Sequence, residues 1–223
     1  MTGRFTKVSA IRPARALKSK TSRRALGVVI LAAGESSRMG RPKLLLPWKK
    51  TSIIGHLIGQ WHALQAEQIC VVLRPGDWPL NAELDRLGFP HRNRIENPES
   101  KRGMFSSVQC AANWDGWEKN LDAWAIILGD QPHLRPDTLR ELLTLGCEHP
   151  DAICQPSHGG HTRHPVFLPP AAFAELRNTR AKTLKDFLQQ TSCRRLEHSV
   201  ADPGLAVDLD RPEDYELAVK SWR

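Results

Sequence analysis

Short apolar runs alternate along the chain with segments in which apolar residues recur every three or four positions. The runs occupy residues 28–31, 69–73 and 123–128, and the second predicted strand, residues 68–73, begins one residue before its run, at Gln68. Continuous apolar character over such short lengths predicts strands that are buried on both faces of a parallel sheet. Helical spacing over residues 51–64 and 136–147 predicts helices that cover this sheet. The alternation of the two patterns predicts βαβ units and an α/β fold.

Shorter patterns predict the remaining elements. Helices are expected after Gly103 and Pro212 and over residues 80–87, 173–176 and 183–188, and strands over residues 91–95, 152–155, 166–168, 193–197 and 205–208. The length of 223 residues suits one domain with a sizeable core. We therefore expect a single-domain, Rossmann-like sandwich with a mostly parallel central sheet over residues 25–223.

Positive charge is concentrated at the N-terminus. Residues 1–24 contain eight Lys and Arg and no acidic residue, and the other 24 basic residues equal the 24 acidic ones in number. The net charge of +8 therefore belongs to residues 1–24, which argues against a nucleic-acid-binding domain. This basic tail has no apolar core of a secretory signal, so a solvated extension, a polyanion- or partner-binding arm and an organellar presequence stay open.

The five cysteines are scattered along the chain and form no CxxC pair. Their odd number and spacing predict the reduced, buried thiols of a cytoplasmic protein and argue against a disulfide framework or a zinc site. They are Cys70, Cys110, Cys147, Cys154 and Cys193. No apolar stretch approaches the length of a membrane-spanning helix, so we expect no membrane partner.

The loop after the first predicted strand carries the strongest chemical signal. In residues 31–47, LAAGESSRMGRPKLLLP, small residues are interleaved with cations. Glycines such as Gly34 and Gly40 let backbone N–H groups approach an anion. Arg38 offers a planar fork for phosphate oxygens and Lys43 a point charge, so we expect a nucleoside triphosphate as ligand. The spacing fits neither the P-loop nor the GxGxxG dinucleotide pattern.

An acidic residue directly follows the predicted strand 123–128. Asp130 lies in Gly129-Asp130-Gln131-Pro132, at the sheet edge where ligands bind in open α/β folds. Magnesium takes carboxylate and phosphate oxygens together, which makes Asp130 a candidate metal ligand. A plain turn of GDxP composition is the alternative.

Two further acids alternate near the C-terminus. Asp208 and Asp210 lie in the predicted extended segment VDLD, where alternate side chains face the same side. Pro212 then begins a helix with Glu213 and Asp214 in its first turn, which the helix dipole explains without any functional role.

Three histidines, His158, His161 and His164, recur every third position. Three imidazoles are a common zinc ligand set. However, Gly159-Gly160 argues against a helix that would align them, and no acidic or thiol partner is adjacent. We therefore predict no zinc site here.

Several of these segments resemble one family. Residues 31–47 resemble the signature LAAGxSxRMGxPKxLLP of the molybdenum cofactor cytidylyltransferases, within the MobA-like nucleotidyltransferases. Residues 97–107, NPESKRGMFSS, resemble the NPxxxxGMxSS element of that family, and residues 208–214 resemble its DIDTPED ending. The resemblance covers nearly the whole chain after residue 24 and implies a nucleotide-diphospho-sugar transferase-like fold.

The resemblance also implies roles for individual residues. It makes Arg38, Lys43 and Asp130 catalytic, and Asp130 and Asp210 ligands of Mg²⁺, with Asp208 as a ligand or a supporting group. The implied nucleotide-binding residues are Leu31, Ala32, Ala33, Gly34, Ser36, Ser37, Arg38, Lys43, Asn97, Gly103 and Ser107.

The implied acceptor side departs from the family pattern. The family usually shows GxxGHPV, and here Gly160 and His164-Pro165-Val166 match while Arg163 replaces the second glycine. The resemblance places His164, Pro165 and Arg163 on this side. Arg163 either changes the path of the loop or adds a cation for the phosphate of the acceptor.

The implied reaction is Mg²⁺-dependent transfer of a nucleoside monophosphate to a phosphate-bearing acceptor, with release of pyrophosphate. The cytidylyltransferases carry LAAG, whereas the guanylyltransferases typically carry LAGG, with glycine at the position of Ala33. The resemblance therefore predicts CTP as donor and molybdopterin cofactor as acceptor, and a molybdoenzyme would be the recipient. A sugar- or alcohol-phosphate nucleotidyltransferase and a non-catalytic molybdenum cofactor carrier are the alternatives.

Overall fold

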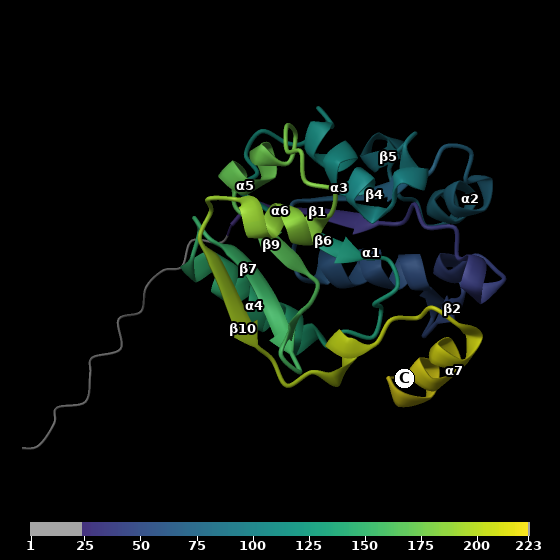
Figure 1. Cartoon of the computed structure of the whole chain (residues 1–223). Helices are drawn as coiled ribbons and strands as arrows, with labels where there is room; N and C mark the ends of the chain where they lie inside the picture. Colours follow the sequence, from purple (N-terminus) through teal and green to yellow (C-terminus); the bar gives the residue numbers. More distant parts are fainter. Residues whose placement is uncertain (1–23, 223) are drawn as a thin grey trace, which may run out of the picture.

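The protein is an α/β sandwich with one sheet between two layers of helices (Figure 1). The structure is a computed structural model that describes residues 24–222, so the predicted basic tail lies outside the described residues except for Arg24. In this part of the chain the main sheet has eight strands, in the order β10-β7-β9-β6-β1-β4-β5, with β8 paired to β7. Their bounds are β1 Leu26–Leu31, β4 Gln68–Leu73, β5 Arg94–Glu96, β6 Ala123–Leu128, β7 Ile153–His158, β8 His161–Thr162, β9 Val166–Leu168 and β10 Arg195–Ser199.

The sheet is mostly parallel, as predicted. Strand β1 pairs in parallel with both β4 and β6, and β5 and β10 extend the sheet in parallel at its two ends. Strand β9 is antiparallel to β6 and β7, and β8 is antiparallel to β7. Because β1 and β6 run in the same direction, the loops that follow them leave the same edge of the sheet.

Alternate residues of the central strands pack on opposite faces of the sheet. In β1, Val28 and Ile30 belong to one core and Val29 to the other. Both faces are covered, which explains why these strands are apolar throughout. One face is covered by α1 (Ile53–Ala63), α2 (Trp78–Arg86), α4 (Pro136–Glu148) and α7 (Pro212–Ser221), and the other by α3 (Met104–Asn113), α5 (Pro170–Glu175) and α6 (Leu184–Gln190). A small hairpin, β2 (Pro47–Trp48) and β3 (Thr51–Ser52), precedes α1.

The strand predicted over residues 205–208 is wrong. Residues Pro203–Ala206 form a 3-10 turn, and residues 207–211 have neither helix nor strand. The cause is local, because the side chain of Asp202 accepts a hydrogen bond from Gly204 N at 2.9 Å and caps this turn. The prediction that Asp208 and Asp210 alternate along a strand therefore loses its basis.

All five cysteines are free thiols, but they differ in burial. Cys70 and Cys154 are buried as predicted, whereas Cys110, Cys147 and Cys193 are only partly buried. Burial raises the pKa of the Cys154 thiol to about 11, so this thiol is uncharged at neutral pH. A search of the described helices finds none with the length and apolar character that crossing a membrane requires.

Gly129 is expected to be intolerant of a side chain, because the ends of β1 and β6 meet there. A Cβ at residue 129 would lie 2.8 Å from the Leu31 carbonyl oxygen and 3.0 Å from Leu44 Cδ2. We expect Gly129→Ala to lower the free energy of unfolding by about 1–3 kcal/mol, which is the cost of overpacking. The midpoint of urea unfolding measures this loss.

Gly59→Ala is the matched control. A Cβ at Gly59, within α1, would meet no atom within 4 Å. Since alanine favours a helix over glycine by roughly 0.5–1 kcal/mol, this variant should unfold at the same or a higher urea concentration. Equal midpoints for the two variants would contradict the close contact between β1 and β6.

Candidate functional site

A cleft of about 830 Å³ lies at the carboxyl edge of β1 and β6. Four separate parts of the chain line it: the loop after β1, the segment that begins α3, the end of β6, and Asp210. The lining residues are 31–38, 43–44, 100–101, 103–104, 107, 128–130 and 210. The cleft thus joins most of the sequence-predicted nucleotide and metal residues at one place.

The loop after β1 folds back on itself around the cleft. Ser36 and Gly40 adopt left-handed conformations, with φ of 52° and 68°, on either side of a 3-10 turn over Ser37–Met39. The Ser36 hydroxyl oxygen accepts a hydrogen bond from Lys43 N at 3.3 Å, which closes the loop. Gly34 faces open space, since a Cβ there would meet no atom within 4 Å. This geometry leaves room for a ligand against the backbone of the loop.

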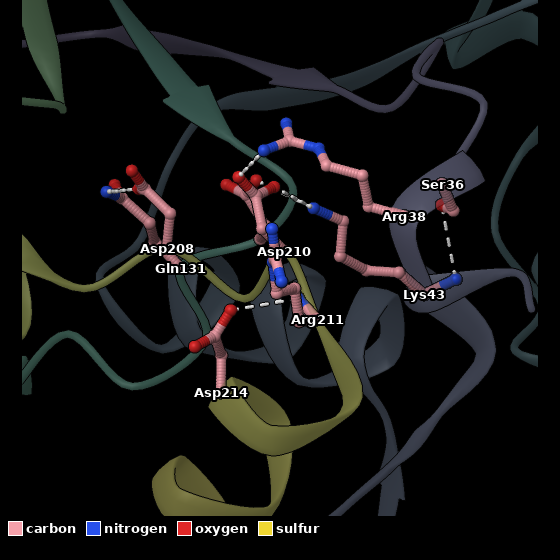
Figure 2. A network of polar contacts seen from close by, with 9 residues as sticks. Ser36, Arg38, Lys43, Gln131, Asp208, Asp210, Arg211 and Asp214 are labelled. Carbon is pink, nitrogen blue, oxygen red and sulfur yellow. Dashed lines mark hydrogen bonds and ion pairs between the residues drawn. The ribbon is translucent and has the colours of Figure 1, made fainter. Parts of the chain in front are cut away.

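A network of ion pairs lies in the cleft (Figure 2). Lys43 Nζ lies 2.9 Å from Asp130 Oδ2 and 3.4 Å from Asp210 Oδ1. Arg38 Nη1 lies 2.7 Å from the other oxygen of Asp210, Oδ2. The side chain of Lys43 is 14% exposed and that of Arg38 67%, so the lysine is inside the network and the arginine at its rim. Two cations therefore neutralise two carboxylates.

Asp208 points to a different partner from Asp210 (Figure 2). Its Oδ1 accepts a hydrogen bond from Gln131 Nε2 at 3.1 Å, and its carbonyl oxygen accepts one from Asp210 N at 3.0 Å. Asp208 does not line the cleft. In this arrangement Asp208 connects the C-terminal segment to the loop after β6.

One carboxylate oxygen in the site has no partner. Asp130 Oδ1 is buried and lacks a hydrogen bond within residues 24–222. A buried acceptor without a partner is costly, and a carboxylate oxygen is a preferred ligand of hard divalent cations. No group of three His, Cys, Asp or Glu in the described chain is arranged to hold a metal ion. The donor set therefore fits a cation that takes its other ligands from phosphate oxygens or water.

Asn97 lies behind the cleft and holds the start of α3. It is 2% exposed, and its Nδ2 donates to Ser106 Oγ at 2.9 Å and to Ser107 Oγ at 3.0 Å. Ser107 lines the cleft, as does Gly103, which begins α3 with a φ of 95°. Asn97 does not line it, so its contact with the site runs through Ser107.

The three residues of the predicted acceptor side do not line the cleft. His164 Nδ1 donates to the Ile126 carbonyl oxygen at 3.2 Å. Burial lowers the pKa of His164, although that hydrogen bond and the negative charges of Asp130 and Asp208 oppose the shift. The imidazole is therefore neutral at pH 7. Arg163 N donates to Pro156 O at 2.8 Å, which fixes the backbone of the loop, and Pro165 is buried.

Some residues of the site were missed by the sequence analysis. Lys101 and Met104 line the cleft between residues that were predicted to do so. A cation two residues before Gly103, in a segment that resembles a nucleotide-binding element of the family, was an available signal for Lys101. Gln131 was read as part of a turn, and no local pattern reveals its bond to Asp208.

Similar proteins are known. A molybdenum cofactor cytidylyltransferase from Escherichia coli (strain K12) is 25% identical to this chain over 201 residues, which cover 89% of this chain and 97% of that protein. The purine catabolism protein PucB from Bacillus subtilis (strain 168) is 28% identical over 203 residues, which cover 85% of this chain and 93% of that protein. A solved structure of Rv0371C in complex with manganese, from Mycobacterium tuberculosis H37Rv, superposes with a TM-score of 0.62 over 88% of this chain and 99% of the Rv0371C chain. The two sequences are 21% identical, so this likeness shows a shared fold.

A family model describes most of the chain. The model of the MobA-like NTP transferase domain matches residues 28–198. This range contains the loop after β1, the start of α3 and Asp130, and so confirms the family that the sequence motifs resemble. The chain belongs to the MobA-like NTP transferase family.

Proposed function

We propose that this protein transfers a nucleoside monophosphate from a nucleoside triphosphate to a phosphate-bearing acceptor and releases pyrophosphate. The observation that carries the proposal is the position of Lys43 between Asp130 and Asp210, with Arg38 beside them, in a cleft that the loop after β1 also lines. Membership of a nucleotidyltransferase family supports it.

The proposed reaction is a displacement at phosphorus. A phosphate oxygen of the acceptor attacks the α-phosphorus and forms the new P–O bond, while the bond from the α-phosphorus to the bridging oxygen breaks and its electrons leave with pyrophosphate. A phosphate acceptor is ionised at neutral pH, so no side chain has to remove a proton from it. The protein contributes by positioning the reactants and stabilising charge.

The two cations have separate roles in this proposal. Lys43 stabilises the charge that develops on the α-phosphate, and Arg38 stabilises the departing pyrophosphate. In the structure both cations are ion-paired with carboxylates. In this proposal a triphosphate, with its higher negative charge, competes with the carboxylates for the two cations. The carboxylates of Asp130 and Asp210 are then left without their cationic partners.

These carboxylates are the proposed holders of a divalent cation, for which we favour Mg²⁺. The partnerless Asp130 Oδ1 and the oxygen-only donor set support this assignment, as does the manganese named for the related structure. When bound, the cation would supply positive charge to the phosphate oxygens. Asp208 is proposed as a support, since Gln131 holds its carboxylate.

We propose CTP as the donor and molybdopterin cofactor as the acceptor, with a molybdoenzyme as the recipient of the product. The LAAG form of the loop and the relative named as a molybdenum cofactor cytidylyltransferase support this choice. Ala33 lines the cleft, and in this proposal its methyl group narrows the space available to a purine. His164, Pro165 and Arg163 remain the proposed acceptor side.

The direct test is pyrophosphate release with Mg²⁺, molybdopterin cofactor and each of CTP, GTP, ATP and UTP in turn. We expect release with CTP. Release only after a sugar phosphate or another alcohol phosphate replaces the cofactor would assign a different acceptor. Tight nucleotide binding without release from any triphosphate would favour the carrier.

Asp130→Asn is expected to abolish pyrophosphate release without unfolding the protein. The amide keeps the size of the side chain but removes the charge that pairs with Lys43 and would hold the cation. Asp137→Asn is the control, because that carboxylate is 94% exposed on α4 and should be dispensable. Circular dichroism checks the fold, and a folded, active Asp130→Asn enzyme would exclude the proposed role.

Lys43→Ala is expected to slow turnover by raising the barrier by about 2–4 kcal/mol, which is the typical cost of losing one preorganised charge-stabilising donor. This corresponds to a kcat lower by roughly thirtyfold to a thousandfold. Lys50→Ala removes an exposed cation outside the cleft and should leave kcat unchanged. If both variants turned over alike, Lys43 would have no catalytic role.

Ala33→Gly is expected to relax the choice of base. Removal of one methyl group from a pocket wall changes discrimination by roughly tenfold or more, so the ratio of kcat/KM for CTP to that for GTP should fall by about that factor. Competition between the two nucleotides at equal concentration measures the ratio. An unchanged or higher preference for CTP would show that Ala33 does not select the base.

A further inference from the structure

Asp202 is a buried carboxylate that the proposed reaction does not use. It is 1% exposed, and both of its oxygens accept hydrogen bonds. Oδ1 accepts from Gly204 N at 2.9 Å, and Oδ2 accepts from Thr138 Oγ1 at 2.8 Å and from Arg135 N at 3.2 Å. Burial of a charge is costly, and these hydrogen bonds, together with the Arg135 guanidinium, whose Nε lies 3.8 Å from Oδ1, offset that cost.

The bonds from Arg135 N and from Thr138 Oγ1, in the first turn of α4, join two segments that both reach the cleft. The first segment is residues 129–138, which begins next to Asp130, and the second is residues 202–210, which ends at Asp210. Two more contacts connect the same segments. His133 Nε2 donates to the Gly204 carbonyl oxygen at 2.9 Å, and Gln131 Nε2 donates to Asp208 at 3.1 Å. These contacts form a continuous row of hydrogen bonds from the buried Asp202 to the cleft.

Few regular elements fix the position of residues 202–210 relative to the loop after β6. Strand β10 ends at Ser199 and α7 begins at Pro212, and between them lies only the turn Pro203–Ala206 within the described chain. Leu205 and Leu209 are buried and anchor the segment to the core, but apolar contacts are not directional. The directional contacts of this segment with residues 131–138 include the hydrogen bonds of Asp202, Gly204 and Asp208.

We propose that Asp202 is a positioning residue of nucleotidyl transfer. Its carboxylate holds residues 202–210 against residues 129–138, so that Asp130 and Asp210 lie on the two sides of Lys43. The inference rests on the proposed function, because it assigns Asp202 to the placement of the two proposed cation ligands. Asp202 itself does not line the cleft.

Two variants test the hydrogen bonds of the buried Asp202. Asp202→Asn keeps the shape of the side chain but turns one acceptor oxygen into a donor, which cannot accept the bond from Arg135 N. Thr138→Val removes only the hydroxyl donor to the same carboxylate. Gln68→Leu is the matched control, because Gln68 is also buried and joins Gly116 O, at 2.9 Å, to Glu118 N, at 2.8 Å, at the opposite edge of the sheet.

The readouts are the midpoint of urea unfolding and the dissociation constant of Mn²⁺, measured by electron paramagnetic resonance with CTP bound. We expect all three variants to unfold at lower urea concentration. We expect Asp202→Asn to weaken Mn²⁺ binding about tenfold, as for the loss of one hydrogen bond to a charged group, and Thr138→Val to weaken it less. Gln68→Leu should bind Mn²⁺ like the wild type, and the Mn²⁺ concentration for half-maximal pyrophosphate release should follow the same order.

The proposal is overturned if Asp202→Asn is folded and binds Mn²⁺ like the wild type, or if Gln68→Leu weakens binding equally. If Asp202→Asn does not fold, Thr138→Val decides by the same comparison. Failure of the proposed function has a different signature. A wild type that binds Mn²⁺ with CTP but releases no pyrophosphate would refute the reaction, while the variants would still test the placement of the carboxylates. A wild type that binds no Mn²⁺ with CTP would refute both.

Discussion

The ion pairs of Lys43 with Asp130 and Asp210 connect the three parts of the chain that form the polar end of the cleft. Two carboxylates that face the same space in a partly buried site repel each other. A cation between them removes this conflict. The loop after β1 supplies that cation, and Arg38 from the same loop adds a second at the rim. The arrangement of the site without ligand therefore depends on groups whose proposed use is to bind phosphate.

Because Lys43 and Arg38 pair with carboxylates and are also the proposed phosphate-binding groups, the charge balance of the cleft changes in the proposed reaction. In the structure two positive and two negative side chains balance, so the cleft carries little net charge at this end. A triphosphate would recruit both cations, and the two carboxylates would then need another positive partner. The partnerless Asp130 Oδ1 indicates that the carboxylates are not fully satisfied even before that exchange. Nucleotide and divalent cation should therefore bind cooperatively, since each removes the charge imbalance that the other creates.

The sequence predicted those features that depend on local residue types. The bounds of β4, β6 and β9 are as predicted, because strands buried on both faces are apolar along nearly their whole length. The loop after β1 was recognisable as a candidate phosphate-binding loop, because a purely structural role rarely explains small residues interleaved with cations at fixed spacing. Features that depend on distant contacts were not predictable. Residues 205–208 read as a strand, but the bonds of Asp202 to Gly204, Thr138 and Arg135 hold a turn there instead. The place of Asn97 behind Ser107 likewise follows from packing and not from spacing.

The two halves of the carboxylate pair differ in how they are held. Asp130 lies two residues after the end of β6, and β6 is hydrogen-bonded on both sides, to β1 and β9. Asp210 lies on a segment without helix or strand, whose contacts with the loop after β6 come mainly from side chains. Arg38, its closest cationic partner, is two-thirds exposed at 67% and loses little burial if it turns toward a ligand. The sheet therefore places Asp130 through backbone pairing, whereas the place of Asp210 depends on side-chain hydrogen bonds to the loop after β6 and to α4.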